Sequence, residues 1–236
     1  MHSENIHIKQ LFHLVTNSLS KILTEMKEGN TTHSATAIEV HAQNIFSRVA
    51  EIDNAFKNLS ITLEYLKKTD YADSKYNFSE HHTFHIENFL LKLISIIDRS
   101  YLLAGSTMSM ENHKIERLGG NKKVYKKLTD FSAESAGILN KMSDAAEELR
   151  ATRNKVAHQS GYSSKNITVL QTIEIAETES ICVKEITDIM SYEEIKDIVI
   201  GDAIESFSEI TLTMDLLVKE LIDSLSFVYT GLVDSA

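Results

Sequence analysis

The fold is decided by residues 38–66, which read IEVHAQNIFSRVAEIDNAFKNLSITLEYL. Apolar residues recur there at steps of three and four, which is the period of an amphipathic helix. They are Ile38, Ala42, Ile45, Phe46, Val49, Ile52, Phe56, Leu59, Leu63 and Leu66. At 3.6 residues per turn the stripe lasts about eight turns. It predicts one long helix with a buried face.

The same period continues on both sides of this segment. It predicts helices over residues 8–26, 80–104 and 203–230, and two shorter ones over 122–139 and 143–158 that separate near Asn140. The chain contains no proline and only eight glycines, so the residues that most often interrupt helices are scarce. We therefore expect an all-α fold. The secondary structure of residues 166–190 stays undecided: they could form a helix or a small irregular or β element, because their apolar residues partly alternate.

Length and composition favour one domain over residues 1–236, since a chain with 42% apolar residues can bury one sizeable core. A single cysteine excludes an internal disulfide framework. The N-terminus lacks the pattern of a signal peptide, and no apolar stretch approaches the roughly 20 residues that a membrane-spanning helix needs. We expect a cytoplasmic protein that has no contact with a membrane.

The net charge of −10 is unevenly distributed. Residues 111–158 contain ten Lys and Arg against seven Asp and Glu, whereas residues 171–236 contain three against fifteen. The basic part includes Lys122, Lys123 and Lys126, and positive charge supplies most of the nonspecific affinity for nucleic acid. We name these lysines as candidate RNA-binding residues, although a solvated helix face has the same pattern.

The chemistry is concentrated in the segment 149–158, which reads LRATRNKVAH. On a helical wheel Arg153 lies on the apolar face between Leu149 and Val156, where a charge is costly unless it meets an anion or an interface. Arg150, Asn154 and His158 share a neighbouring polar face, because they are spaced four residues apart. His158 occupies the last turn, where the helix dipole favours imidazolium.

A fixed cation and a titratable imidazole are the two groups that cleavage of RNA by its own 2′-hydroxyl requires. Arg153 would stabilise charge on the pentavalent phosphate, and His158 would move protons at the 2′-hydroxyl or the leaving oxygen. Neither role uses a metal ion or a cofactor. Asn154 would orient the pair, and Arg150 and Lys155 would contact RNA.

This segment resembles the signature of the HEPN superfamily (higher eukaryote and prokaryote nucleotide-binding), which is an arginine, a polar residue, about three more residues and then a histidine; here they are Arg153, Asn154 and His158. Residues 80–104, with Glu87 and Asp98, are similar to a second helix of one mostly uncharacterised subgroup, the Cthe2314-like HEPN proteins. The resemblance implies a bundle of four to five core helices with extra N- and C-terminal helices. The core would span about 33–160, and an acidic helical extension about 190–236.

The resemblance also implies a function and partners. Many members of the superfamily are endoribonucleases in defence or stress systems, and a homodimer brings two Arg/His pairs together. By this resemblance Asp98 joins the catalytic candidates, and an antitoxin or another regulatory protein becomes a candidate partner. Many toxin members carry a tyrosine two residues after the histidine, but here that residue is Ser160. Pairing with the antitoxin class that modifies this tyrosine is therefore disfavoured.

Three alternatives remain open at this point. The same groove could belong to a non-catalytic module that binds nucleotide, RNA or a protein. The motif could be structural, with Arg153 paired to Asp98 and His158 capping its helix. His81 and His85 have the spacing of two zinc ligands on a helix, but no further ligand is identifiable, and a solvated helix start is the simpler reading.

Overall fold

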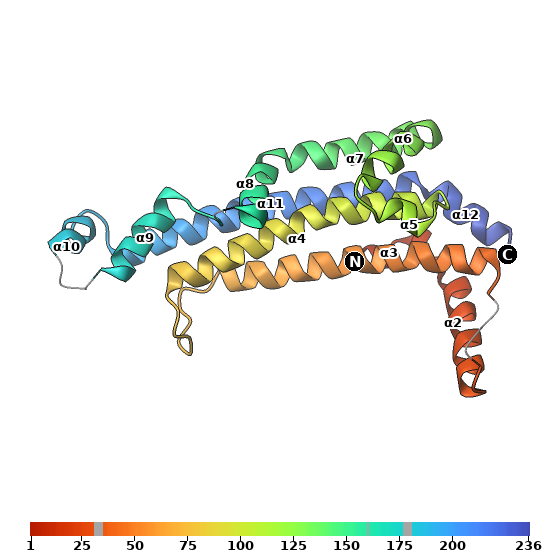
Figure 1. Ribbon diagram of the computed structural model, residues 1–236, viewed down its shortest axis with the longest axis horizontal. Helices are drawn as coiled ribbons and strands as arrows, with labels where there is room; N and C mark the ends of the chain where they lie inside the picture. The colour runs from red at the N-terminus through yellow and green to blue at the C-terminus, as the bar shows by residue number, and fades with distance from the viewer. Residues whose placement is uncertain (31–34, 160, 177–180) are drawn as a thin grey trace. The chain divides into compact units, whose positions relative to one another are not determined.

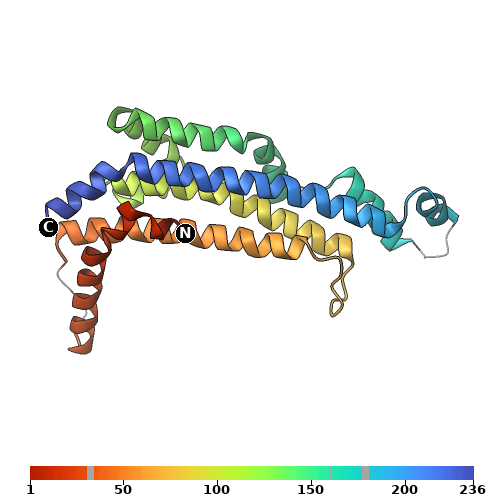
Figure 2. The same cartoon turned by 180° about the vertical axis from the view of Figure 1, so that it is seen from behind.

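The structure is a computed structural model that describes residues 1–30, 35–159, 161–176 and 181–236. Within these residues every segment of regular secondary structure is a helix, which confirms the all-α prediction (Figures 1 and 2). The α-helices are α1 (Ile6–Lys9), α2 (Phe12–Lys27), α3 (Ala37–Leu66), α4 (Phe78–Thr107), α5 (Asn112–Ile115), α6 (Gly120–Phe131), α7 (Ala133–Ala145), α8 (Glu147–His158), α9 (Lys165–Ile175), α10 (Ile181–Thr187), α11 (Tyr192–Ser224) and α12 (Ser226–Asp234), and a 3₁₀ turn, η1, covers His2–Glu4.

The helices pack into two compact units, and each unit is discontinuous in sequence. Unit 1 consists of Met1–Phe56, Ser95–Ala145 and Met214–Ala236, and unit 2 consists of Lys57–Ile94 and Ala146–Thr213. The boundaries fall inside α3, α4 and α11, so these helices contribute residues to both units. The single domain over residues 1–236 stays a prediction, and each unit is described by itself below.

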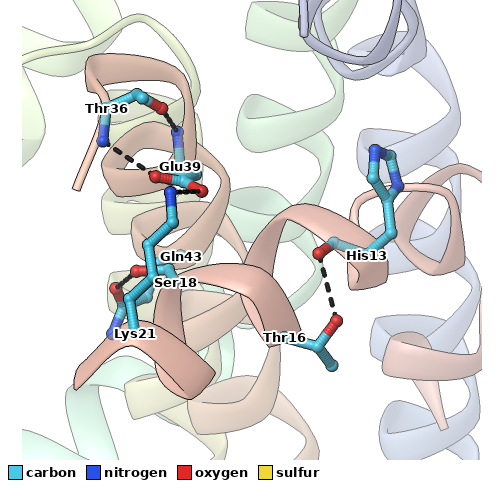
Figure 3. A network of polar contacts seen from close by, with 7 residues as sticks. All are labelled: His13, Thr16, Ser18, Lys21, Thr36, Glu39 and Gln43. Atoms are coloured by element: carbon cyan, nitrogen blue, oxygen red, sulfur yellow. Dashed lines mark hydrogen bonds and ion pairs between the residues drawn. The ribbon is translucent and has the colours of Figure 1, made fainter. Parts of the chain in front are cut away.

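Unit 1 holds its N-terminal segment by specific polar contacts. The backbone N–H of His2 donates a 2.7 Å hydrogen bond to Asp53, on α3. Between α2 and α3 the Lys21 ammonium lies 2.7 Å from the buried Glu39, and Ser18 donates to Gln43 (Figure 3). The hydrogen bond from Lys21 lowers the pKa of Glu39, because it stabilises the carboxylate. These contacts fix α2 against the start of α3.

Unit 2 is held by an aromatic contact and an apolar cluster. The rings of Phe89, on α4, and Phe207, on α11, stack with centroids 4.0 Å apart. A cluster of buried residues joins α4, α9 and α11, and its members are Phe78, Ile167, Leu170, Ile195 and Val199. Glu174 of α9 accepts hydrogen bonds from Ser79 of α4 and from the Tyr192 hydroxyl of α11. The cluster and this carboxylate therefore connect the same three helices.

The described residues of the segment 166–190 form α9 and α10 with turns after them and contain no strand, which decides the open choice between helix and strand. The side chain of Ser164 accepts a hydrogen bond from the backbone N–H of Ile167 and caps α9. Ile167 and Leu170 are buried one turn apart, whereas Ile175 is exposed. The alternation in the sequence is therefore incidental, because burial follows the helical period. Residues 177–180 lie outside the described residues.

The helix breaks before the motif also differ from the prediction. Asn140 lies inside α7, where its side chain donates a 2.6 Å hydrogen bond to the Tyr125 hydroxyl. The chain breaks instead at Ser132, whose hydroxyl accepts from the N–H of Ser135, and at Ala146. In the described part of the chain no helix is both long and apolar enough to cross a membrane.

Candidate functional site

The residues of the motif lie on α8, a short helix in unit 2 with an exposed character. None of its side chains is buried. Glu147 and Glu148 lie in its first turn, and Lys155 and His158 in its last turn. This arrangement places negative charge at the positive end of the helix dipole and positive charge at its negative end. The charges at its two ends therefore stabilise α8, which has no fully buried side chain.

The guanidinium of Arg153 contacts its neighbour in sequence. Its Nη1 donates a 3.2 Å hydrogen bond to the side-chain oxygen of Asn154. Its Nε is buried and has no hydrogen-bond partner among the described residues. A buried donor without an acceptor costs free energy, so an anion or a further acceptor at this position would be stabilised. Within the described part of unit 2, Arg153 forms no ion pair with a carboxylate.

Asn154 connects the two functional groups. Arg153 and His158 are five residues apart, which on a helix means about 140° around the axis and roughly 7.5 Å along it. Asn154 and His158 are four residues apart and so share a face. The hydrogen bond to Asn154 therefore draws the guanidinium toward the face that carries His158. The His158 side chain is exposed and is free to meet a substrate.

The chain that leaves α8 is anchored by Glu87, on α4. The Glu87 carboxylate accepts a 2.7 Å hydrogen bond from the backbone N–H of Tyr162. Gly161 has a φ of 76°, and a Cβ there would lie 2.8 Å from the same carboxylate oxygen. Only glycine fits this conformation and this close approach without strain. Glu87 therefore anchors the chain at Gly161 and Tyr162, a few residues after α8 ends at His158.

Comparison with protein families gives a match to the Cthe2314-like HEPN family over residues 29–221. The chain belongs to the Cthe2314-like HEPN family. The matched range contains the whole of α8 and most of both units. Comparison with curated proteins and with solved structures gives no significant match. The resemblance seen in the sequence is thus confirmed at the level of the family.

The structure distributes the other predicted site residues of this HEPN protein over both units. Asp98 lies on α4 in unit 1, where it accepts a 2.8 Å hydrogen bond from Asn121. Lys122, Lys123 and Lys126 are exposed on α6, also in unit 1. Arg150 and Lys155 lie on α8 itself, and the Arg150 Nε is 4.0 Å from Glu147. The roles of all these residues stay predictions.

Sequence reasoning did not identify the role of Glu87. It counted Glu87 as part of a family resemblance, whereas in the structure this residue anchors a loop 75 positions further along the chain. Gly161 marks the local turn, but nothing in the sequence points to its distant partner. In the structure His81 stacks on Tyr71 and His85 stacks on Tyr65. Among the described residues, no three or more histidine, cysteine or acidic side chains are grouped so as to hold a metal ion.

Proposed function

We propose that this HEPN protein is an endoribonuclease that cleaves RNA by attack of the 2′-hydroxyl on the adjacent phosphate, without a metal ion. The observation that carries the proposal is the hydrogen bond from Arg153 to Asn154 on an exposed helix that ends in His158. This hydrogen bond turns the Arg153 guanidinium toward the helix face that carries the exposed imidazole of His158. Membership of the HEPN family supports the same chemistry, since the resemblance of the motif implies endoribonuclease activity for many members of the superfamily.

The reaction assigns one role to each side chain. His158 accepts the proton of the 2′-hydroxyl while the oxygen forms a bond to phosphorus. Arg153 donates hydrogen bonds to the phosphate oxygens, whose negative charge grows in the pentavalent transition state. The bond from phosphorus to the 5′-oxygen breaks, and that oxygen takes up a proton from a second acid. The products are a 2′,3′-cyclic phosphate and a free 5′-hydroxyl.

A second copy of the chain supplies the second acid in this proposal. Because α8 buries none of its side chains within one chain, its half-buried Leu149 and Val156 are available for a contact between two copies. Such a contact would bring two Arg153/His158 pairs together. We further propose that the enzyme acts in the cytoplasm in a defence or stress system, with RNA as substrate and a regulatory protein as partner.

The test compares three proteins on a mixed RNA pool in EDTA: wild type, His158→Ala and His113→Ala. His113 is the matched control, because it is an exposed histidine that lies outside α8, in unit 1. We expect wild type and His113→Ala to cut RNA at similar rates, and His158→Ala to lose about 10²–10⁴-fold in rate. Equal cutting by all three proteins would exclude His158. No cutting by any of them, with all three folded, would favour a binding module in place of an enzyme.

A further inference from the structure

A pocket of unit 2 lies between the end of α3 and the start of α4, and its lining residues are far in sequence from those of the motif. It has a volume of about 620 Å³, within the range of small-molecule sites. Six of the seven side chains that line it are aromatic rings, counting the two histidines. They come from the last turn of α3, from the connector 67–77 and from the first turns of α4.

The inner wall of the pocket is a set of nearly parallel rings. Tyr71 lies on His81 with ring centroids 4.0 Å apart and planes 9° apart. Tyr65 lies on His85 at 4.9 Å and 25°. The hydroxyl of Tyr71 donates a 2.9 Å hydrogen bond to the carbonyl of Tyr65, and a ring nitrogen of His81 lies 2.6 Å from the Ser74 hydroxyl. These bonds hold the rings in place before any ligand arrives.

The outer wall consists of two exposed rings. Tyr76 and Phe84 are 56% and 62% exposed, and each meets a histidine of the inner wall edge-on, with an interplanar angle of 75°. Removing a large aromatic side chain from water is favourable, and ring faces attract other flat rings. A flat ligand can therefore pack against the two exposed rings.

Two lysines beside the pocket offer cations that can contact an anionic group next to that flat ring. The ammonium of Lys68 lies 4.2 Å from the Tyr65 ring centroid, and that of Lys75 lies 5.1 Å from the Tyr76 centroid. Two cations already lie against these rings, so a third cation would be repelled, whereas a phosphate would be attracted. Burial, and then His81 and Lys68, lower the pKa of His85, which favours the neutral form of its ring.

One acidic side chain also lines the pocket and can accept a hydrogen bond from the edge of a bound ring. Glu80 is the only carboxylate among the described residues that line the pocket. Its Oε2 accepts a 2.8 Å hydrogen bond from the backbone N–H of Asn77, which fixes its position. The other carboxylate oxygen remains an acceptor for an N–H group of a bound ring.

We propose that this pocket binds a nucleobase, which packs against Tyr76 and Phe84 while Lys68 and Lys75 contact its phosphate. Stacking of bases on aromatic side chains beside basic residues is a general mode of binding for nucleotides and single-stranded nucleic acid. The base can come from a free nucleotide or from an unpaired position of an RNA strand, and the chemistry is the same. The proposal does not depend on cleavage by His158, which lies on another helix.

The experiment measures binding of AMP, of ribose 5-phosphate, which lacks the base, and of an adenosine octanucleotide. AMP has no internal phosphodiester to cut, and His158→Ala protein with EDTA keeps the octanucleotide intact. Phe84→Ala and Tyr76→Ala are the test variants. Phe12→Ala is the matched control, because Phe12 is a phenylalanine of similar exposure, 54%, on α2. Tyr76→Phe keeps the ring and removes only the hydroxyl.

We expect AMP or the octanucleotide to bind, and the two test variants to bind it about 5- to 150-fold more weakly. The control and Tyr76→Phe should stay within about twofold of wild type. Binding of AMP identifies a nucleotide site, and binding of the octanucleotide alone identifies a site for RNA. The proposal is overturned if neither binds, if ribose 5-phosphate binds as well as AMP, or if folded test variants bind like the control.

A second measurement on the wild-type protein covers the case in which the test variants do not fold. Proton NMR of the imidazole resonances reports on the inner wall directly. Adding the ligand that binds should shift the signals of His81 and His85, because a bound ring changes their magnetic environment. The signal of exposed His113 should not move. Unmoved His81 and His85 signals at saturation would place the ligand elsewhere and would overturn the proposal.

Discussion

Arg153 donates a 3.2 Å hydrogen bond from its guanidinium to the side-chain oxygen of Asn154, the residue that follows it on α8. Neighbours in a helix point in directions about 100° apart. The bond therefore turns a long, flexible side chain toward the face that Asn154 shares with His158. In the proposed reaction, Asn154 positions Arg153.

The first prediction separates catalysis from stability at these two residues. Arg153→Ala should slow RNA cleavage by about 10²–10³-fold, because one donor to the transition-state charge is lost. Asn154→Ala should slow it less, since the guanidinium remains but is less well oriented. Both variants should change the free energy of unfolding by no more than about 0.5 kcal/mol, because α8 buries no side chain. Chemical denaturation and cleavage rates check the two parts. A large loss of stability in Arg153→Ala would instead indicate a structural role.

A second prediction concerns the turn after α8. Gly161→Ala should lower the free energy of unfolding by roughly 1–2 kcal/mol, because of the left-handed φ, and more if Glu87 cannot move away from the new methyl group. Gly137→Ala is the control: this glycine lies inside α7 with nothing within 4 Å of a new Cβ. It should stabilise the protein by about 0.5–1 kcal/mol. Equal effects of the two substitutions would argue against the described turn.

The third prediction tests the contact between two copies. Leu149→Asp should weaken association of the chains at least tenfold in analytical ultracentrifugation, because it places a charge in the proposed apolar contact on α8. Leu212→Asp, on α11 of the same unit, is the control at an exposed leucine outside α8. RNA cleavage should fall together with association in Leu149→Asp. A wild-type protein that remains monomeric while it cuts RNA would remove the second copy from the mechanism.

The fourth prediction follows from a buried histidine. Burial, and then the charge of His85, lower the pKa of His82 to about 4. An unfolded chain has a histidine pKa of about 6.5. Between these values the unfolded state binds a proton that the folded state does not, so the free energy of unfolding falls as the pH falls from about 6.5 to about 4. The loss from this residue is at most about 3 kcal/mol.

Denaturation curves at several pH values check this dependence. In His82→Gln the slope of the unfolding free energy against pH should be smaller over that window, whatever its absolute stability. His113→Gln, at an exposed site, should keep the wild-type slope. An unchanged slope in His82→Gln would mean that other groups cause the pH dependence.

The sequence predicts α3 and α4 well, because burial of an apolar stripe is a local property. The helix predicted over 203–230 was wrong at both ends, since α11 already begins at Tyr192 and the chain breaks at Leu225 before α12. The stripe from Ile38 to Leu66 falls on α3, Ala37–Leu66, to within one residue. The helix break at Ala146 was not predicted, since alanine favours helix and the sequence offers no local reason to stop there. Where two helices with compatible patterns follow each other, packing decides the break.

The site was predictable only in part, for the same reason. The Arg153, Asn154 and His158 pattern is local and visible in the sequence. The contact between Glu87 and Tyr162 joins residues 75 positions apart and is not visible. The pocket of aromatic rings was also missed, because the connector 70–80 is polar and aperiodic. Its tyrosines form a pocket wall only in the folded chain, where Tyr71 stacks on His81.

The chemical identity of the RNA ends that purified wild-type protein makes in EDTA decides whether Arg153 and His158 cleave RNA without a metal ion. Attack by the 2′-hydroxyl, with Arg153 and His158 as the active groups, predicts 2′,3′-cyclic phosphate or 3′-phosphate ends and free 5′-hydroxyls, and His158→Ala should yield none. Products with 3′-hydroxyl and 5′-phosphate ends, or product formation that stops in EDTA and returns with added Mg²⁺, would contradict it.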